Sequence, residues 1–410
     1  MKFLSKETAD KLRTRARFAL YIFAAAVPIL SAALFYILRP FPAVMDWASE
    51  SISAPIRGYL GLLSSVFRAV SMMEVLGVAA VIWLIYHIAK TVWLARRSKY
   101  KLKIISQRLI AAVLVIIFVW SAHCWLWESG HYGTGFAAKN GFTSSGATVE
   151  ELAAAAELFL KKANELAPQV SRDEGGHWAE RRADYFASSR YIYHNLMSEF
   201  PSLGGRTKSM QYRPKPMLFS WLMSRTGFTG IYFALTGEAN ININAPGCLI
   251  PATVAHELAH QLGVNAEAEA NFVAIAACIT SGDVVYEYSG YLMGLMHLLD
   301  ALYEADYAAF YDIHQRFAPE LRQDWTDDSE YWQAQNTDTG IGAAGAADRR
   351  VGAGDRGKRI FDRLLHRKAI GLPLPADEAA AVIFNRELVA RHQSPDSLTA
   401  QTARPAPSSH

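Results

Sequence analysis

The chain has 410 residues, of which 51% are hydrophobic, 19% are charged and 12% are aromatic. Water-soluble domains usually carry about 25% charged residues, so this composition indicates a chain that lies partly in a membrane and partly in water. The aromatic content excludes disorder throughout, and three cysteines exclude a disulfide-stapled scaffold. A formal net charge of +3 is too small to indicate a nucleic-acid partner.

Three segments near the N-terminus are apolar enough to predict membrane-spanning helices. Residues 18–38 and 109–127 contain no Asp, Glu, Lys or Arg, and residues 75–95 contain only Lys90. Each segment is close to the roughly 20 residues that a helix needs to cross the hydrocarbon core. We therefore expect residues 1–128 to form a membrane anchor in the lipid bilayer.

Basic residues predict the orientation of this anchor. They gather in the N-terminal tail and in the loop between the second and third spans, and basic loops remain in the cytoplasm. Three spans then place everything after residue 128 outside. We expect a multi-pass protein of the cytoplasmic membrane, with a cytoplasmic N-terminus and an extracytoplasmic catalytic domain. The basic residues are Lys2, Lys6, Lys11, Arg13, Arg15 and Arg17 in the tail and Arg96, Arg97, Lys99, Lys101 and Lys103 in the loop.

The rest of the chain divides into three expected parts. Residues 129–147 are rich in Gly, Ser and Thr and predict a linker. Residues 148–335 carry alternating helical and strand patterns and predict a globular domain. Residues 336–410 begin with a Gly/Ala-rich stretch and end in Ser, Thr, Pro and Ala, which predicts a divergent, partly disordered tail.

The globular domain is predicted to be mainly helical with a small sheet, an α+β arrangement. Apolar residues at helical spacing predict most of its elements. Two short alternating segments, residues 231–236 and 240–244, predict strands just before the central helix, and residues 201–216 predict a loop. The expected helices cover residues 150–165, 178–200, 250–262, 266–281, 289–304 and 305–316.

The strongest chemical signal is the sequence HELAH at residues 256–260. Its two histidines, His256 and His260, are one helical turn apart on one face, so both imidazoles can bind one Zn²⁺ ion. Glu257 stands beside that metal. Zinc lowers the pKa of bound water toward about 7, and Glu257 can take its proton and deliver it to the leaving amine. Apolar residues on the rest of the helix predict a buried site rather than two solvated histidines.

A third metal ligand is expected to follow on the next helix, where Glu267 and Glu269 both stand. We prefer Glu269, because the apolar run that follows it suggests that the helix enters the core at this point. Glu267 is then interpreted as an exposed residue of the first turn, favoured there by the helix dipole. The alternative, with Glu267 as the ligand, stays open.

Several other residues are weaker candidates. Residues 230–244 could form an edge strand along which a peptide substrate aligns, or an ordinary core strand. Gln261 could hydrogen-bond to a metal ligand and orient it. Cys248 and Cys278 could pair outside the cytoplasm, although two reduced buried thiols are the preferred interpretation. The candidate donors for an oxyanion are Tyr232, Tyr286, Tyr288, Tyr291 and His297.

Three stretches of the chain resemble the bacterial membrane family catalogued as domain of unknown function 3810. They are PKPMLFSWLMSRTGFTGIYFALTGEANININ (residues 214–244), HELAHQLGVNAEAEANFVAIAAC (256–278) and, within residues 292–325, LMHLLDALYEADYAAFYDIHQRFAPELRQDW. With the N-terminal spans, the resemblance covers roughly residues 15 to 335. The Gly/Ala/Arg-rich stretch from Asn336 departs from the helical ending expected there.

The resemblance implies a zincin-like metallopeptidase fold with His256, His260 and Glu269 as zinc ligands and Glu257 as the catalytic acid and base. Together with the motif, it predicts a membrane-anchored, gluzincin-like zinc metallopeptidase that hydrolyses peptide bonds with a zinc-activated water. Its peptide or protein substrate is not identified by the resemblance. The alternative is a non-catalytic membrane protein that uses the zinc site for structure or ligand sensing. The two differ at Glu257, because a structural site needs no carboxylate that avoids the metal.

Overall fold

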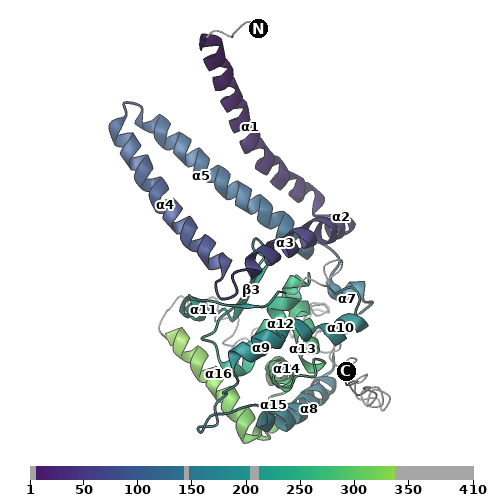
Figure 1. Cartoon of the computed structure of the whole chain (residues 1–410). Helices are drawn as coiled ribbons and strands as arrows, with labels where there is room; N and C mark the ends of the chain where they lie inside the picture. Colours follow the sequence, from purple (N-terminus) through teal and green to yellow (C-terminus); the bar gives the residue numbers. More distant parts are fainter. Residues whose placement is uncertain (1–5, 143–146, 204–211, 338–410) are drawn as a thin grey trace, which may run out of the picture.

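The computed structural model describes residues 6–142, 147–203 and 212–337, with side chains from residue 22 to residue 335. These residues are mostly helical and contain a small three-stranded sheet, which confirms the expected α+β class. Figure 1 shows long helices that project from a compact helical body. The expected tail, residues 336–410, lies outside the described residues except for its first two positions.

The projecting helices match the expected spans in position. Within the described part of the chain, two helices are long and apolar enough to cross a membrane, Met72–Arg97 and Lys101–His131. The described apolar part of the first helix, Ile22–Leu38, is shorter. The helices are α1 (Lys6–Leu38), α4 (Met72–Arg97) and α5 (Lys101–His123), and α5 continues through a π-helical segment, η2 (Cys124–Glu128), into α6 (Ser129–His131).

The arrangement of these helices separates their two ends. The beginning of α1 and the turn between α4 and α5 lie on the same side of the molecule, far from the helical body (Figure 1). The end of α1, the start of α4 and the end of α5 lie next to that body. Helix α5 packs between α1 and α4, and the Ser121 hydroxyl donates to the Ser31 hydroxyl across the first of these contacts (2.9 Å).

A further helical segment crosses the lower ends of α1 and α5 (Figure 1). It consists of α2 (Pro42–Ala48), one π-helical turn, η1 (Ser49–Ser53), and α3 (Ala54–Ser65). Ser49 and Ala54 both have right-handed helical backbone angles, so these pieces form one uninterrupted helix, which we call the crossing helix. No element was predicted for these residues.

The start of α4 is held by two carboxylates. Ser71 accepts a hydrogen bond from the Glu74 backbone N–H (3.2 Å), which caps the helix. The Glu74 carboxylate in turn accepts from the backbone N–H groups of Leu218 and Phe219 (3.0 and 2.6 Å). The Glu238 carboxylate, which is buried in the sheet, accepts from the free N–H groups of Met72 and Met73 (both 3.1 Å). An acidic group at a helix N-terminus satisfies free donors and the helix dipole together.

The segment predicted as a linker differs from that expectation. Residues 129–142 form α6 and α7 (Phe136–Lys139), and the Phe136 side chain is buried in the same core cluster as the central helices. Phe136 packs against Phe200 and Phe272, with ring centroids 5.6 and 6.4 Å apart. The Gly, Ser and Thr content predicted a linker, but the buried Phe136 ring anchors this stretch to the domain.

The helical body surrounds two contiguous apolar clusters. One lies around α12 and α13, and the other lies between α8 and α14, with Ile279 packed against both. Helix α14 packs against α8, α12 and α13 and therefore joins the two clusters. The helices are α8 (Val149–Leu166), α9 (Arg182–Ser188), α10 (His194–Glu199), α11 (Ser220–Thr226), α12 (Ile250–Gln261), α13 (Glu267–Ile279), α14 (Val284–Ala305), α15 (Tyr307–Gln315) and α16 (Pro319–Thr337), with short 3₁₀ turns η3 (Ala167–Gln169), η4 (Ser189–Tyr191) and η6 (Gly247–Leu249).

The sheet has the order β1–β3–β2, so β2 is an edge strand. Strand β1 (Lys215–Pro216) runs parallel to β3 (Glu238–Ile241), and β2 (Gly230–Phe233) runs antiparallel to it. Both predicted strands exist. The second was expected at residues 240–244, whereas β3 begins two residues earlier, closer to the turn that connects it with β2. Asn242, just past β3, donates to the Ser224 hydroxyl and the Phe228 carbonyl (3.0 and 2.9 Å), so it fastens the strand to α11.

The helix expected over residues 178–200 is broken. Trp178 pairs with Arg172 in an isolated β-bridge, and only α9, η4 and α10 are helical. Ser188 and Ser189 turn their hydroxyls to carbonyls three residues back, a local bond that competes with helix continuation. Cys248 and Cys278 are free, buried thiols in separate clusters, in agreement with the preferred interpretation.

Candidate metal centre

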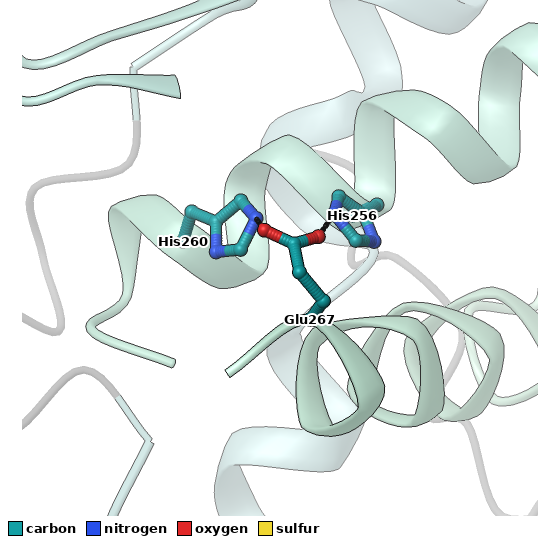
Figure 2. Close-up of side chains that lie close together, drawn as sticks. All are labelled: His256, His260 and Glu267. Carbon is teal, nitrogen blue, oxygen red and sulfur yellow. Dashed lines mark hydrogen bonds and ion pairs between the residues drawn. The ribbon is translucent and has the colours of Figure 1, made fainter. Parts of the chain in front are cut away.

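Helix α12 carries the HELAH motif through the interior of the protein. Pro251 occupies its first turn, where a missing N–H is harmless, and the Ala252 N–H donates to the Ser289 hydroxyl of α14 (3.0 Å). His256 and His260 point to the same side of α12 (Figure 2). Their ring centroids are 4.7 Å apart and their planes are nearly perpendicular, as the one-turn spacing predicts.

The chain reverses direction after α12 and brings a carboxylate to both imidazoles. Gly263 has a positive φ of 95°, which side-chain-bearing residues rarely adopt, and α13 begins four residues later. The Glu267 carboxylate lies between the two rings (Figure 2), 3.1 Å from His256 Nε2 and 3.5 Å from His260 Nε2. One ligand atom from each of these three residues lies within 4.8 Å of the others.

Glu269 occupies a different place from the one expected for a third ligand. Its carboxylate accepts hydrogen bonds from the backbone N–H groups of Phe136 and Ala137 (2.8 and 2.9 Å), which are the free donors at the start of α7. The preference for Glu269 is therefore corrected: the structure brings Glu267, the alternative acidic residue, to the histidines. Glu267 was also expected to be exposed, and its side chain is 72% exposed. This exposure does not prevent its carboxylate from contacting both imidazole rings.

Glu257 lies on the inner side of the centre, against strand β2. A Cβ atom on Gly230 would come within 2.5 Å of Glu257 Oε1, so only glycine leaves room for this carboxylate. The Tyr232 backbone hydrogen-bonds the carboxylate, and burial raises its pKa above the usual range. Its Oε2 atom is buried and has no hydrogen-bond partner among the described residues. A buried carboxylate oxygen without a donor is unfavourable and marks a position for a further polar group.

The electrostatics of the histidine pair depend on Glu267. Partial burial by itself would raise the pKa of Glu267, but the hydrogen bonds to both imidazoles hold that pKa well below its usual range. Burial likewise lowers the pKa of His260, yet Glu267 and the nearby Glu257 carboxylate raise it above the ordinary value overall. The centre therefore holds two carboxylates next to two imidazoles, an arrangement that attracts a cation.

His260 is oriented by contacts on its far side. Its Nδ1 lies 2.7 Å from the Val264 carbonyl, which leaves Nε2 directed toward Glu267. The Trp127 indole packs edge-on against the His260 ring (5.3 Å between centroids) and also contacts Tyr232 (5.6 Å). Asn265 holds the Trp127 carbonyl with its side-chain amide (3.0 Å).

The sequence analysis did not connect Trp127 and Asn265 with the centre. Trp127 ends an apolar segment, and its sequence environment points only to a membrane interface. Asn265 lies in the turn between the two helices, where a polar residue is ordinary. Proximity to the HELAH motif was the signal available for Asn265, whereas nothing local indicates the contact of Trp127.

The weaker candidates are distributed unevenly. Tyr232 lies near the centre, and its hydroxyl is buried without a partner among the described residues. Tyr286 and Tyr288 instead donate to the Tyr185 carbonyl and to the Asp324 carboxylate and serve packing. Gln261 supports the sheet rather than the ligands, because its amide donates to the Gly237 carbonyl (3.1 Å). Tyr291 packs edge-on against Phe159, within the other apolar cluster.

Comparison with known families agrees with the resemblance seen in the sequence. The family model described as "Protein of unknown function (DUF3810)" matches residues 49–344, which is most of the chain. The chain belongs to this family. The matched range begins inside the crossing helix and includes α4, α5, the sheet and the centre on α12 and α13. No curated protein and no solved structure matches the chain.

Proposed function

We propose that the protein is a membrane-anchored zinc metallopeptidase of the zincin type. The observation that carries this proposal is the joint arrangement of His256, His260 and Glu267 with the buried Glu257 carboxylate, whose Oε2 atom has no partner among the described residues. A site that only held a metal for stability would have no use for that carboxylate. The sequence motif and the geometry support the same assignment independently, because the motif does not specify Glu267.

The donor set fits zinc. Two imidazole nitrogens and one carboxylate are the protein ligands of many catalytic zinc sites, which keep one further position open. His256, His260 and Glu267 would hold the ion. When bound, zinc supplies a Lewis acid that lowers the pKa of water and polarises a carbonyl group. The buried Oε2 atom of Glu257 fits this view, because it faces a position where a polar partner is missing.

Glu257 would act as general base and then as general acid. Burial raises the pKa of this carboxyl, which makes it a better proton acceptor near neutral pH than an exposed glutamate. It would remove a proton from the attacking water and later deliver it to the nitrogen of the leaving amine. The Tyr232 backbone and the close approach of Gly230 hold the carboxylate in place for both transfers.

The outer edge of β2, where the Tyr232 backbone hydrogen-bonds Glu257, would align the substrate. The Asn242 N–H donates to the Thr229 carbonyl (2.9 Å), and alternation along an antiparallel pair then turns the N–H and C=O groups of Gly230 and Tyr232 away from β3. These groups lie beside Glu257. An extended peptide could add to this edge as a further strand, which places its backbone next to the catalytic carboxylate. The substrate class would therefore be a peptide or an unfolded protein segment.

The test compares the wild-type chain with Glu257→Gln, both purified in detergent. Gln keeps the shape of the side chain but cannot take up a proton, so zinc content should stay stoichiometric. Cleavage of a quenched fluorescent peptide library should fall by about 10²–10⁴-fold. Removal of zinc by a chelator should abolish wild-type cleavage, and added zinc should restore it.

Equal cleavage by the two proteins would refute a catalytic role for Glu257. Stoichiometric zinc without any difference in cleaved peptides, both in this assay and in a proteomic comparison of membranes and secreted peptides, would instead favour a structural or ligand-sensing site. The variant Glu165→Gln changes an exposed glutamate on α8 that forms an ion pair with Lys162. It should behave like the wild type in both measurements.

We also propose that the anchor has three spans with a cytoplasmic N-terminus. The beginning of α1 and the turn between α4 and α5, where the basic residues stand, lie together on the side away from the helical body (Figure 1). This arrangement supports the orientation expected from the basic loops. A reporter fused after residue 335 should be active only if it is of an extracytoplasmic type. Activity of a cytoplasmic reporter at this position would overturn the orientation.

A further inference from the structure

The crossing helix, residues 42–65, has an unusual division between its two faces. The face packed on the protein consists mostly of small or polar residues, and Met45 is the one large apolar side chain among them. The Ser53 hydroxyl donates to the Trp125 carbonyl, and the Arg57 guanidinium donates to the Leu126 carbonyl (3.0 Å). The buried residues are Met45, Ala48, Ser49, Ser53, Arg57, Gly58, Gly61 and Ser64.

The opposite face is exposed and apolar. Its side chains recur every three to four residues, so they form one continuous stripe along the helix. Leu63 and Val66 are 68% and 75% exposed. From residue 51 to residue 67, every side chain that is classed as exposed is apolar. We call this the apolar stripe; it consists of Trp47, Ile52, Ile56, Tyr59, Leu62, Leu63, Val66 and Phe67.

This division is the reverse of that of a helix on a water-soluble protein. Such a helix buries its apolar face and leaves polar side chains in solvent, whereas a contiguous exposed apolar stripe marks a contact with another apolar phase. The small residues on the inner face allow close packing: a Cβ atom on Gly61 would come within 3.0 Å of the Gly237 carbonyl. The inner face is thus packed against the rest of the protein, and the apolar stripe needs a different partner.

The surroundings of the stripe identify that partner. At one end of the stripe, Ile37 in the last turn of α1 and Phe41 just before α2 are exposed and apolar. At the other end, Val75 and Leu76 of α4 are exposed and apolar as well. Helix α4 is long and apolar enough to cross a membrane. The crossing helix runs across the lower ends of α1 and α5 (Figure 1), which is where a bilayer around these helices would end.

The charged residues near the apolar stripe also fit a position at the boundary of a bilayer. Arg39 precedes the stripe and stacks on Tyr36 and Tyr132, and Arg68 follows it in an exposed position. Glu50 stands beside the stripe and is paired with Lys139 at 2.7 Å. Arginine side chains at both ends of the stripe, with tyrosines at one of them, suit the headgroup region, where their polar ends reach phosphates and water.

We propose that the crossing helix lies in the plane of the membrane, with the apolar stripe embedded at the boundary between headgroups and acyl chains. The occupant of the stripe is lipid, and the leaflet is the one at which α1 ends and α4 begins. The helix then separates the bilayer from the sheet. Its inner face contacts both η2 and the turn between β2 and β3. This assignment does not depend on metal binding or on peptidase activity.

The test uses spin labels on the full chain in nanodiscs of zwitterionic and anionic phospholipid. The variants Ile56→Cys and Leu63→Cys place a nitroxide on the stripe, and Tyr311→Cys places one on α15, where the native side chain is also exposed. The native cysteines are buried and will not react. Power saturation measures access to oxygen, which concentrates in lipid, and to a water-soluble nickel chelate.

The ratio of oxygen to nickel access should be severalfold higher at positions 56 and 63 than at position 311. High nickel access at both stripe positions would overturn the proposal. Low access to both reagents, together with broadening between labels, would assign the stripe to a second copy of the chain and would overturn it as well. Elution from a size-exclusion column and the melting temperature show whether each variant folds like the wild type. If either stripe variant does not, a label at Tyr59→Cys provides a third stripe position.

Discussion

Glu267 and Glu269 are two residues apart, yet they serve different parts of the molecule. Side chains at i and i+2 of a helix point in widely different directions, so only one of them can face α12. The apolar run after Glu269 does enter the core, as the sequence suggested. However, the position that enters the core is not the one that faces the histidines, because Glu267 stands where α13 first meets α12.

Substitutions of the two glutamates should have different effects on zinc affinity. Glu267→Gln removes a proposed zinc ligand and should weaken zinc affinity by at least about 100-fold, since changes to groups that only support metal ligands already cost 10- to 100-fold. Glu269→Gln should leave zinc affinity unchanged but lower the melting temperature, because charged hydrogen bonds contribute about 1.5–3 kcal/mol. A competition titration with a chelator measures the first effect. The reverse pattern would restore Glu269 as the ligand.

His314 should make the α15–α16 corner sensitive to acid. It packs among Phe310, Phe317 and Trp325, and burial together with the nearby Arg322 lowers its pKa below the ordinary value. A base with a lowered folded pKa stabilises the fold above its unfolded pKa, and this contribution is lost as the pH falls through the folded value.

The variant His314→Phe tests this effect, because it keeps an aromatic ring without a titrating group. The wild-type melting temperature should fall more than that of the variant when the pH is lowered from 7.5 toward 5. Melting curves of the detergent-solubilised proteins measure both slopes. Parallel slopes would show that His314 does not contribute to the acid sensitivity.

At the scale of elements, the joint between the sheet and α4 depends on a buried ion pair. Lys215 on β1 contacts the Glu238 carboxylate on β3, and both side chains are almost fully buried. Lys215 also donates to the Ser64 and Val70 carbonyls (2.7 and 3.0 Å), on the segment that leads into α4. The pair therefore connects the crossing helix, α4 and the sheet at one point.

Lys215→Met should destabilise the protein by about 3–5 kcal/mol, because it leaves the Glu238 carboxylate buried without its cation. Combination with Glu238→Gln should recover part of this loss. Lys162→Met breaks only an exposed pair with Glu165 and should change stability by no more than about 1 kcal/mol. Thermal and denaturant unfolding in detergent measure these differences. Equal effects of the two lysine variants would contradict a role for the buried pair.

Most of the helices were predictable because their periodicity is local. The expected helices at residues 150–165, 250–262 and 266–281 correspond closely to α8, α12 and α13. The helix at 178–200 was wrong, because Trp178 pairs in a β-bridge and stacks on Tyr288 of a distant helix. No pattern within that segment reports such a contact.

At the scale of the whole molecule, the boundary between anchor and domain is less distinct than the sequence suggested. Segments on both sides of residue 129 contact the body: Trp127 packs on His260, and Phe136 enters the core. Asn265 and Glu269 each hold backbone groups of this stretch. Residues before 148 therefore help to form the candidate metal centre.

An excised domain of residues 148–337 should consequently be unstable. It lacks the buried Phe136 ring, and loss of a buried aromatic side chain costs about 3–5 kcal/mol. It also lacks the N–H groups that satisfy Glu238. We expect no cooperative melting transition for this fragment under conditions where the full chain in detergent melts cooperatively. A stable fragment that binds zinc with full affinity would show that the expected domain boundary was correct.

The sequence by itself determined the features that depend on neighbours within a few turns: the apolar helices, the spacing of His256 and His260, Glu257 beside them, the helical class and the family. The tertiary structure decided which glutamate faces the histidines, which aromatic residue packs behind them and which helix exposes an apolar stripe. These depend on how separate segments pack: Glu267 reaches the histidines across the turn between α12 and α13, whereas Phe136 contacts Glu269, and Trp127 contacts His260, from more than a hundred residues away. Local periodicity reports which face of a helix is apolar, but only the packed molecule shows what that face meets.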